Sequence, residues 1–199
     1  DLQSDHSDEA YLTLIQFNRQ YDVVEEDRPI NNVKFLGTET YEPNGGTALL
    51  DAVGRGVTSL RKLITDKERA FVIIMTDGQE NSSSEFTSEG IKALIKSCEK
   101  DGNWTFTFLG ASQNSWTGSQ LLGLRREQSV YYGGDAHTHK AAFAGLTGTT
   151  RQYRGASAAS VENTGQTVTS AMASEGEDVQ TDGLWVPKKE AETPAEKKE

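Results

Sequence analysis

The sequence predicts an α/β protein with a doubly wound, mostly parallel sheet and helices on both of its faces. Phe71–Met75 is an apolar run that stops at polar and turn residues, which is typical of a strand buried on both faces. Leu49–Ile64 carries apolar residues at the 3.6-residue spacing of a helix that packs on one side. Predicted strands and helices then alternate as far as Tyr132, which is the order of a parallel sheet.

The composition limits both the size of the fold and the class of partner. A chain of 199 residues makes one ordinary domain plus an additional segment, or two very small domains. The mean hydropathy is −0.61, so we expect part of the chain to be solvated. The net charge of −10 opposes non-specific binding to nucleic acid or to an anionic membrane, and it favours cation binding. No stretch approaches the ~18 apolar residues of a transmembrane helix, and the single cysteine, Cys98, excludes an internal disulfide.

The first predicted elements form an antiparallel hairpin at the edge of the sheet. Ala10–Phe17 is a strand, Asn18–Gln20 a short turn, and Tyr21–Val24 the returning strand. The polar segment Glu25–Asn44, which contains two prolines, predicts a connection with little regular structure.

Leu49–Ile64 has the strongest helical pattern in the chain. Thr47 stands where it would cap this helix or lie just before it. Gly54 and Gly56 each weaken a helix by about 1 kcal/mol relative to alanine, and they would let the helix pack closely on the sheet.

The second half of the chain continues the alternation of helices and strands. We expect these elements, in order: a helix capped by Thr87 or Ser88 with Ile91, Leu94, Ile95 and Cys98 on its inner face, a strand over Trp104–Leu109, a short helix over Ser115–Leu124, a short strand over Val130–Tyr132, and a helix over Asp135–Tyr153.

The composition shifts at about Gly155. From there Gly, Ser, Ala, Thr and Glu dominate, and the chain ends in Lys, Glu, Pro and Ala. We therefore predict one domain over residues 1–154 and a disordered, low-complexity tail over residues 155–199. Leu184–Val186 is the one apolar cluster in this tail. It is either a docking motif or, as we prefer, an unstructured part of the tail without a binding role.

Two polar side chains are predicted to meet at one edge of the sheet. Asp77 follows the strand Phe71–Met75, and Thr47 precedes the helix Leu49–Ile64. Open α/β sheets bind ligands at the carboxyl ends of their strands, so Asp77 would lie where ligands bind. An isolated Asp-Gly pair is more often a cap or a turn, but a hydroxyl converging on a carboxylate suits a hard divalent cation.

These stretches are similar to the von Willebrand factor type A family. Gly45–Leu49 (GGTAL) and Ile73–Gly78 (IIMTDG) match the second and third parts of that family's metal-ion-dependent adhesion site, and the resemblance covers roughly Ala10–Tyr153. It is nearest to bacterial, cytoplasmic members. The resemblance implies a Rossmann-like sheet of order 3-2-1-4-5-6 with an edge hairpin. It also implies a Mg²⁺ or Mn²⁺ site that recruits an acidic residue of a protein partner. Thr47 would bind the ion directly or through water, and Asp77 would bind it directly or accept from its waters.

The chain departs from the family in its first motif, Asp-x-Ser-x-Ser, which is absent. Asp5–Glu9 is only a partial match, because its last residue is not serine and no apolar strand precedes it. We therefore expect the central first strand, which would lie between the strands Ala10–Phe17 and Phe71–Met75, to be missing. Its roughly five buried side chains would contribute about 10 kcal/mol, so we expect a fragment of a longer protein that is marginally stable alone and binds its metal weakly.

Three other residues have roles that the sequence leaves open. Glu80 and Asn81 would either orient metal-bound water or only shape the loop. Asp51 is either a second acceptor behind Thr47 or, as we prefer slightly, an exposed carboxylate near the positive end of the helix dipole.

The function predicted from these residues is cation-dependent binding of a protein partner, without catalysis, in the cytoplasm. The partner's carboxylate would complete the shell of the ion, and the N-terminal end of the helix Leu49–Ile64 would help to bind that anion. Two alternatives remain. One is a Mg²⁺-dependent hydrolase on a similar sheet, with Asp77 as ligand or nucleophile. The other is a scaffold whose metal site is not functional.

Overall fold

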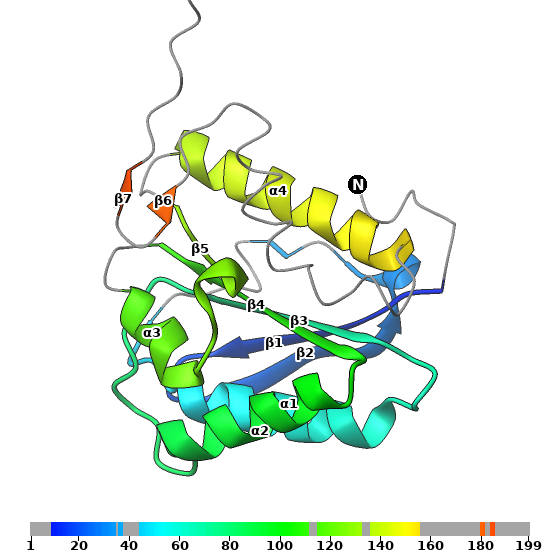
Figure 1. Ribbon diagram of the computed structural model, residues 1–199, viewed down its shortest axis with the longest axis horizontal. Coiled ribbons are helices and arrows are strands. Elements are labelled where there is room, and N and C mark those ends of the chain that lie inside the picture. Colours follow the sequence, from blue (N-terminus) through cyan, green and yellow to red (C-terminus); the bar gives the residue numbers. More distant parts are fainter. Residues whose placement is uncertain are drawn as a thin grey trace, which may run out of the picture.

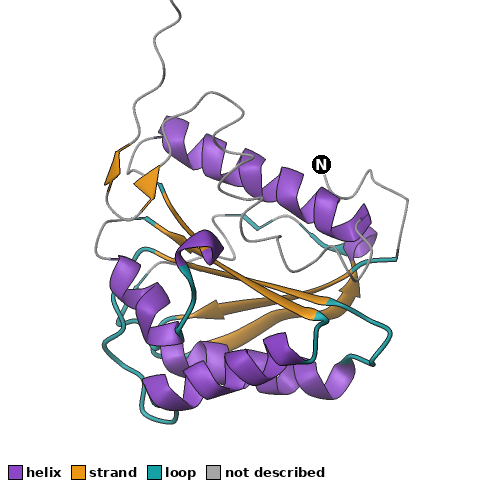
Figure 2. Ribbon diagram, viewed as in Figure 1, coloured by secondary structure: helices purple, strands orange, loops and turns teal. Residues whose placement is uncertain are grey.

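Two sheets and four α-helices make up the structure, a computed structural model that describes residues 9–34, 36–37, 44–111, 115–132, 136–155, 180–181 and 184–185. Figure 1 labels these elements, and Figure 2 shows the hairpin and the longest strands of the larger sheet between α4 (Ala136–Gly155) and the helices α1 (Leu49–Leu63) and α2 (Ser88–Lys100). The smaller sheet is the predicted hairpin, in which β1 (Tyr11–Phe17) pairs antiparallel with β2 (Tyr21–Pro29).

The returning strand of the hairpin is longer than predicted. It runs through the charged segment Glu25–Arg28 to Pro29, which pairs with Tyr11, so the predicted end at Val24 is wrong. The register shifts near Thr13, whose Oγ1 accepts from the Asp27 N–H at 3.1 Å. Backbone pairing with β1 therefore overrides the poor strand propensity of these residues. A short 3₁₀ turn, η2 (Ile30–Asn32), follows.

The larger sheet contains the predicted parallel strands. β3 (Ala70–Thr76), β4 (Trp104–Gly110) and β5 (Ser129–Tyr131) lie side by side in parallel. β6 (Gln180–Thr181) and β7 (Leu184–Trp185) extend the sheet antiparallel beyond β5. The mixed α/β class, with a parallel sheet, flanking helices and an antiparallel hairpin, is thus confirmed.

Helices cover both faces of the parallel strands. α1 (Leu49–Leu63), α2 (Ser88–Lys100) and α3 (Ser115–Leu122) lie on one side, and α4 (Ala136–Gly155) lies on the other (Figure 1). The larger core joins the first group of helices to the sheet; its most buried side chains include Leu49, Val57, Ile91, Ile95, Cys98, Phe106 and Phe108. The smaller core lies under α4 and consists of Leu109, Val130, Tyr132 and Ala142, with Met75, Ala111 and Leu146 against it.

The two glycines of α1 allow close contacts, as predicted. A methyl group at Gly54 would overlap the ring of Phe86, and one at Gly56 would lie 3.0 Å from Cδ1 of Ile15 in β1. Only the second contact is with a sheet. α1 therefore packs on the hairpin through Gly56 and on the larger sheet through its core residues.

The strands that we expected to flank a missing strand, β1 and β3, belong to different sheets. β1 pairs with β2, β3 pairs with β4, and no described strand pairs with β1 or β3 at the other edge.

The predicted boundary at 154/155 falls at the end of α4, and the predicted disorder of the tail stays a prediction, since most of residues 156–199 lie outside the described part. Among the described helices, none combines the length and apolar character that a membrane crossing requires.

Candidate functional site

Two loops meet at the carboxyl end of β3: residues 44–48, which lead into α1, and residues 77–87, which follow β3. A methyl group in place of a hydrogen on Gly78 would overlap Oγ1 of Thr47. A methyl group on Gly46 would overlap the hydroxyl of Ser82 and lie 2.8 Å from Oδ1 of Asn81. The structure thus brings the Thr47 loop against the loop that carries Asp77, and glycine allows this approach on each side.

A small turn presents Asp77 at the tip of β3. The buried side chain of Thr76 accepts from the Gly78 N–H at 3.1 Å and donates to the Gly78 carbonyl at 3.3 Å. Asp77 lies between these two residues and is exposed, and its carboxylate has no hydrogen bond or ion pair with any residue that the structure describes. It is therefore accessible to a cation.

Thr47 lies just before α1 and does not cap it. The N-cap residue is Ala48, and no side chain accepts a bond there, so the capping alternative is wrong. The Thr47 N–H donates to Oδ1 of Asn81 at 2.9 Å, and the Asn81 N–H donates to the Thr47 carbonyl at 3.0 Å. Thr47 is half-buried, and its Oγ1, which lies against Gly78, has no hydrogen-bond partner among the described residues.

Glu80 fastens the loop after β3 to the start of α1. One of its oxygens accepts from the N–H groups of Ser82 and Ser83, at 2.9 and 2.8 Å. The other accepts from the Leu50 N–H at 3.0 Å and the Ser83 hydroxyl at 2.7 Å. Burial opposes ionisation of Glu80, but these hydrogen bonds, led by those from Ser83, bring its pKa below the ordinary value. The loop-shaping role is therefore observed for Glu80, as it is for Asn81 through its bonds to Thr47.

Asp51 makes a second set of hydrogen bonds between the start of α1 and the loop after β3; we call this set and that of Glu80 the clasps. Our preferred interpretation of Asp51 as an exposed carboxylate is wrong. Its side chain is only 8% exposed, and it accepts from three consecutive backbone N–H groups, those of Ser84, Glu85 and Phe86, at 2.8–2.9 Å. Burial opposes its ionisation, but these three bonds and the charge of Arg55 lower its pKa. The exposed Arg55 also pairs with Glu85 across the same junction.

At the N-terminal end of α1, where we predicted an anion site, three backbone N–H groups are engaged within the chain. The N–H of Leu50 is bound by Glu80, the N–H of Asp51 by the Ser83 hydroxyl at 3.1 Å, and the N–H of Ala52 by the Ala48 carbonyl. The carboxylate of Glu80 thus already stands where a partner's carboxylate was expected.

The donors at the junction fit a hard cation only in part. A hydroxyl and a carboxylate are ligands that Mg²⁺ and Mn²⁺ accept, but two protein donors leave most of an octahedral shell to water and to a partner. Within the described ranges, no group of three or more His, Cys, Asp and Glu side chains is placed to bind a metal ion. The partial motif at Asp5–Glu9 falls mainly on residues 1–8, which lie outside the described residues.

Sequence reasoning missed the serines that organise this junction. Ser83 bonds both Glu80 and the start of α1, and the Ser82 hydroxyl bonds Asn81 at 2.6 Å. The sequence signal was the run of three serines at 82–84 after two polar residues, which is typical of side-chain to backbone bonding in a loop.

Comparisons of the chain with protein-family models, with curated proteins and with solved structures gave no match.

Proposed function

We propose that this chain is a protein-binding module of the von Willebrand factor A type that acts through a divalent cation. Thr47 and Asp77 would bind Mg²⁺ or Mn²⁺, and the partner would contribute an acidic side chain. The observation that carries the proposal is the position of Thr47 Oγ1 against Gly78, beside an exposed Asp77 carboxylate that no described residue engages.

The charge of the chain supports a role for the cation in partner binding. The net charge is −10, so an acidic partner is repelled unless a positive charge lies between the two proteins. The backbone N–H groups of Leu50 and Asp51 at the start of α1 are already bound within the chain and are not free to supply it. A bound cation would supply that charge, and the clasps made by Glu80 and Asp51 fix the loop that carries Asp77.

Two protein donors also set the expected strength of cation binding. Sites with few protein ligands keep most of their water, so we expect weak binding by the protein alone and tighter binding when the partner's carboxylate is present. The experiment is calorimetric titration with MgCl₂, followed by titration with MnCl₂ while amide signal loss is recorded by NMR. Signal loss should begin at residues 46–48 and 76–79.

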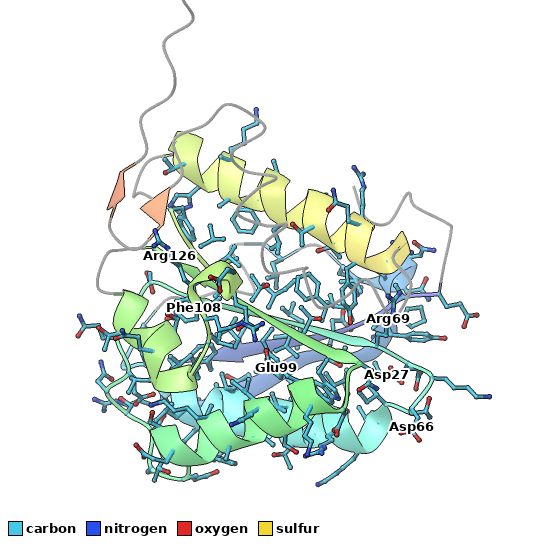
Figure 3. All side chains as sticks on the ribbon, in the orientation of Figure 1. Asp27, Asp66, Arg69, Glu99, Phe108 and Arg126 are labelled. Carbon is cyan, nitrogen blue, oxygen red and sulfur yellow. The ribbon has the colours of Figure 1, made fainter. Side chains whose placement is uncertain are left out.

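Matched variants separate this site from general charge effects. Thr47→Ala and Asp77→Ala should each reduce the heat of titration, whereas Thr58→Ala, on the exposed side of α1, should leave it unchanged. Asp66→Ala removes the same charge as Asp77→Ala but on the turn before β3, at the other end of that strand (Figure 3). Identical titrations of the wild-type protein and both site variants would refute the proposal. Absence of heat in all of them would favour the scaffold, and phosphate-ester turnover lost in Asp77→Ala would favour the hydrolase.

A further inference from the structure

The turn of the hairpin carries an arginine, Arg19, that reaches the loop before α1. A methyl group added to Gly46 would lie 3.0 Å from Nε of Arg19 and 2.8 Å from Oδ1 of Asn81. Gly46 directly precedes Thr47, and the same oxygen of Asn81 accepts from the Thr47 N–H. The guanidinium of Arg19 therefore borders the groups that position the proposed cation ligand.

Hydrogen bonds on both sides of Arg19 fix the turn that carries it. Oδ1 of Asn18 accepts from the Gln20 N–H at 2.6 Å and so spans the arginine. Nδ2 of Asn18 donates to Oδ1 of Asn44 at 2.9 Å, and the Asn18 carbonyl accepts from the Ala48 N–H at 2.7 Å. Asn44 and Ala48 are the first and last residues of the loop before α1. The turn is thus attached to both ends of this loop, and Arg19 reaches its middle.

The charge of Arg19 is available to an acid from another molecule. Its side chain is exposed and makes no hydrogen bond or ion pair with any residue that the structure describes. Three other arginines, by contrast, each pair with a carboxylate of the chain: Arg28, Arg55 and Arg61. In a chain with a net charge of −10, an exposed guanidinium without a described acidic partner is a suitable site for a carboxylate of a partner.

Arg19 also changes how a cation would bind at the junction. Like charges repel, so a guanidinium beside Thr47 raises the free energy of a bound Mg²⁺. A carboxylate relieves this repulsion, because one of its oxygens can bind the ion while the other accepts from the guanidinium. The cation and the acid would then each strengthen the binding of the other.

We propose that Arg19 binds the partner's carboxylate beside the cation and makes the site specific for an acidic group. This inference rests on the proposed function and adds a second positive group to it. A neutral oxygen ligand from a partner would complete the shell of the ion but leave the guanidinium unpaired. A carboxylate engages both, and its planar geometry matches the donor fork of arginine.

Titration of the whole chain with an acidic peptide tests this role. The probe is the blocked pentapeptide Gly-Gly-Asp-Gly-Gly in MgCl₂, the neutral control has asparagine in place of the aspartate, and both are followed by NMR. The Nε–H signal of Arg19 should shift with the acidic peptide only. Arg19→Gln should weaken binding of that peptide about three- to tenfold. Arg28→Gln removes the same charge near the other end of the hairpin and should leave the binding unchanged.

Titration with MgCl₂ in the absence of peptide separates this role from a purely structural one. Arg19→Gln should bind Mg²⁺ at least as tightly as the wild-type protein, because a repelling charge is gone. Thr47→Ala and Asp77→Ala should bind it more weakly. Arg19→Lys keeps the charge without the planar fork, so it should restore part of the peptide binding.

The possible outcomes distinguish Arg19 from the cation site itself. Equal peptide binding by the wild-type protein and Arg19→Gln would overturn the role of the arginine and leave the cation site standing. Failure of the peptide to bind any of these proteins would overturn that role as well. If Arg19→Gln weakens both the peptide and the Mg²⁺ titration, the arginine only supports the loops. Peptide binding that requires Arg19 but neither MgCl₂ nor Asp77 would refute the proposed function and keep Arg19 as a carboxylate-binding residue.

Discussion

Thr47 and Asn81 bind each other twice, although 34 residues separate them in the chain. The Thr47 N–H donates to the Asn81 side chain, and the Asn81 N–H donates to the Thr47 carbonyl. This pair ties the loop before α1 to the loop after β3. The Thr47 hydroxyl takes no part in it, so the residue is positioned by bonds that do not engage its side-chain oxygen.

Removing the side chain of Asn81 tests how much this pair contributes. Asn81→Ala eliminates the bonds that its Oδ1 accepts from the Thr47 N–H and from the Ser82 hydroxyl, and should lower the free energy of unfolding by about 1–3 kcal/mol, at about 0.5–1.5 kcal/mol for each bond. Urea denaturation measures the loss. Asn81→Asp keeps an acceptor oxygen in the same place and serves as the control. Equal stability of the alanine variant and the wild-type protein would show that the backbone bond alone fixes the loops.

A methyl group on Gly78 should disturb Thr47 directly. Because the added carbon would overlap Thr47 Oγ1, Gly78→Ala forces the threonine to another rotamer or separates the loops. We expect a loss of about 1–3 kcal/mol in unfolding free energy, and weaker Mg²⁺ binding if Thr47 is a ligand. The measurements are denaturation and calorimetry on the same sample. Unchanged chemical shifts at Thr47 would contradict the overlap.

The elements with strong local patterns were predictable from the sequence. The apolar run Phe71–Met75 and the helical periodicity of Leu49–Ile64 gave β3 and α1 to within two residues at each end. Each pattern reports burial of one segment, which is a local property of the chain. The position of Thr47 beside the Asp77 loop followed from topology, because α1 leads directly into β3 and packs against it, so the start of the helix lies near the carboxyl end of that strand.

The features that depend on distant partners were not predictable. β2 continues through Glu25–Arg28 because β1 offers backbone partners, which no propensity of those residues indicates. Asp51 is buried because its acceptor oxygens face Ser84–Phe86, a loop more than thirty residues later without any periodic pattern. A carboxylate in the first turn of a helix is ordinarily exposed, so the sequence favoured the wrong role.

The contact between Gly54 and Phe86 should outweigh helix propensity. Alanine favours a helix over glycine by about 1 kcal/mol, yet a methyl group at Gly54 would overlap the Phe86 ring. We therefore expect Gly54→Ala to destabilise the protein by about 1–3 kcal/mol, measured by thermal and urea unfolding. Gly148→Ala in α4 is the matched control, because no atom lies near its added methyl group, and it should be neutral or stabilising. Stabilisation by both variants would mean that the ring moves aside without cost.

Acid should weaken the clasps that Asp51 and Glu80 make. Burial opposes the ionisation of both groups, but their hydrogen bonds lower both pKa values below those of the unfolded chain, which are about 3.9 and 4.3. The stabilisation is thus fully present above about pH 5 and is lost as the pH falls through the folded-state pKa values. Urea unfolding of the wild-type protein between pH 7 and pH 3 should show this loss.

The contribution of Asp51 to that loss can be isolated by substitution. Asp51→Asn should be less stable than the wild-type protein at pH 7. The asparagine amide has one acceptor oxygen where the carboxylate has two, and its NH₂ group would face the backbone N–H groups that Asp51 accepts from. Its stability should also depend less on pH in acid, because one of the titrating clasps is gone. Asp66→Asn makes the same change in net charge at an exposed turn and corrects for the general effect of charge. If Asp51→Asn and Asp66→Asn lose stability in parallel as the pH falls, the three bonds to Ser84, Glu85 and Phe86 are not the source of the acid sensitivity.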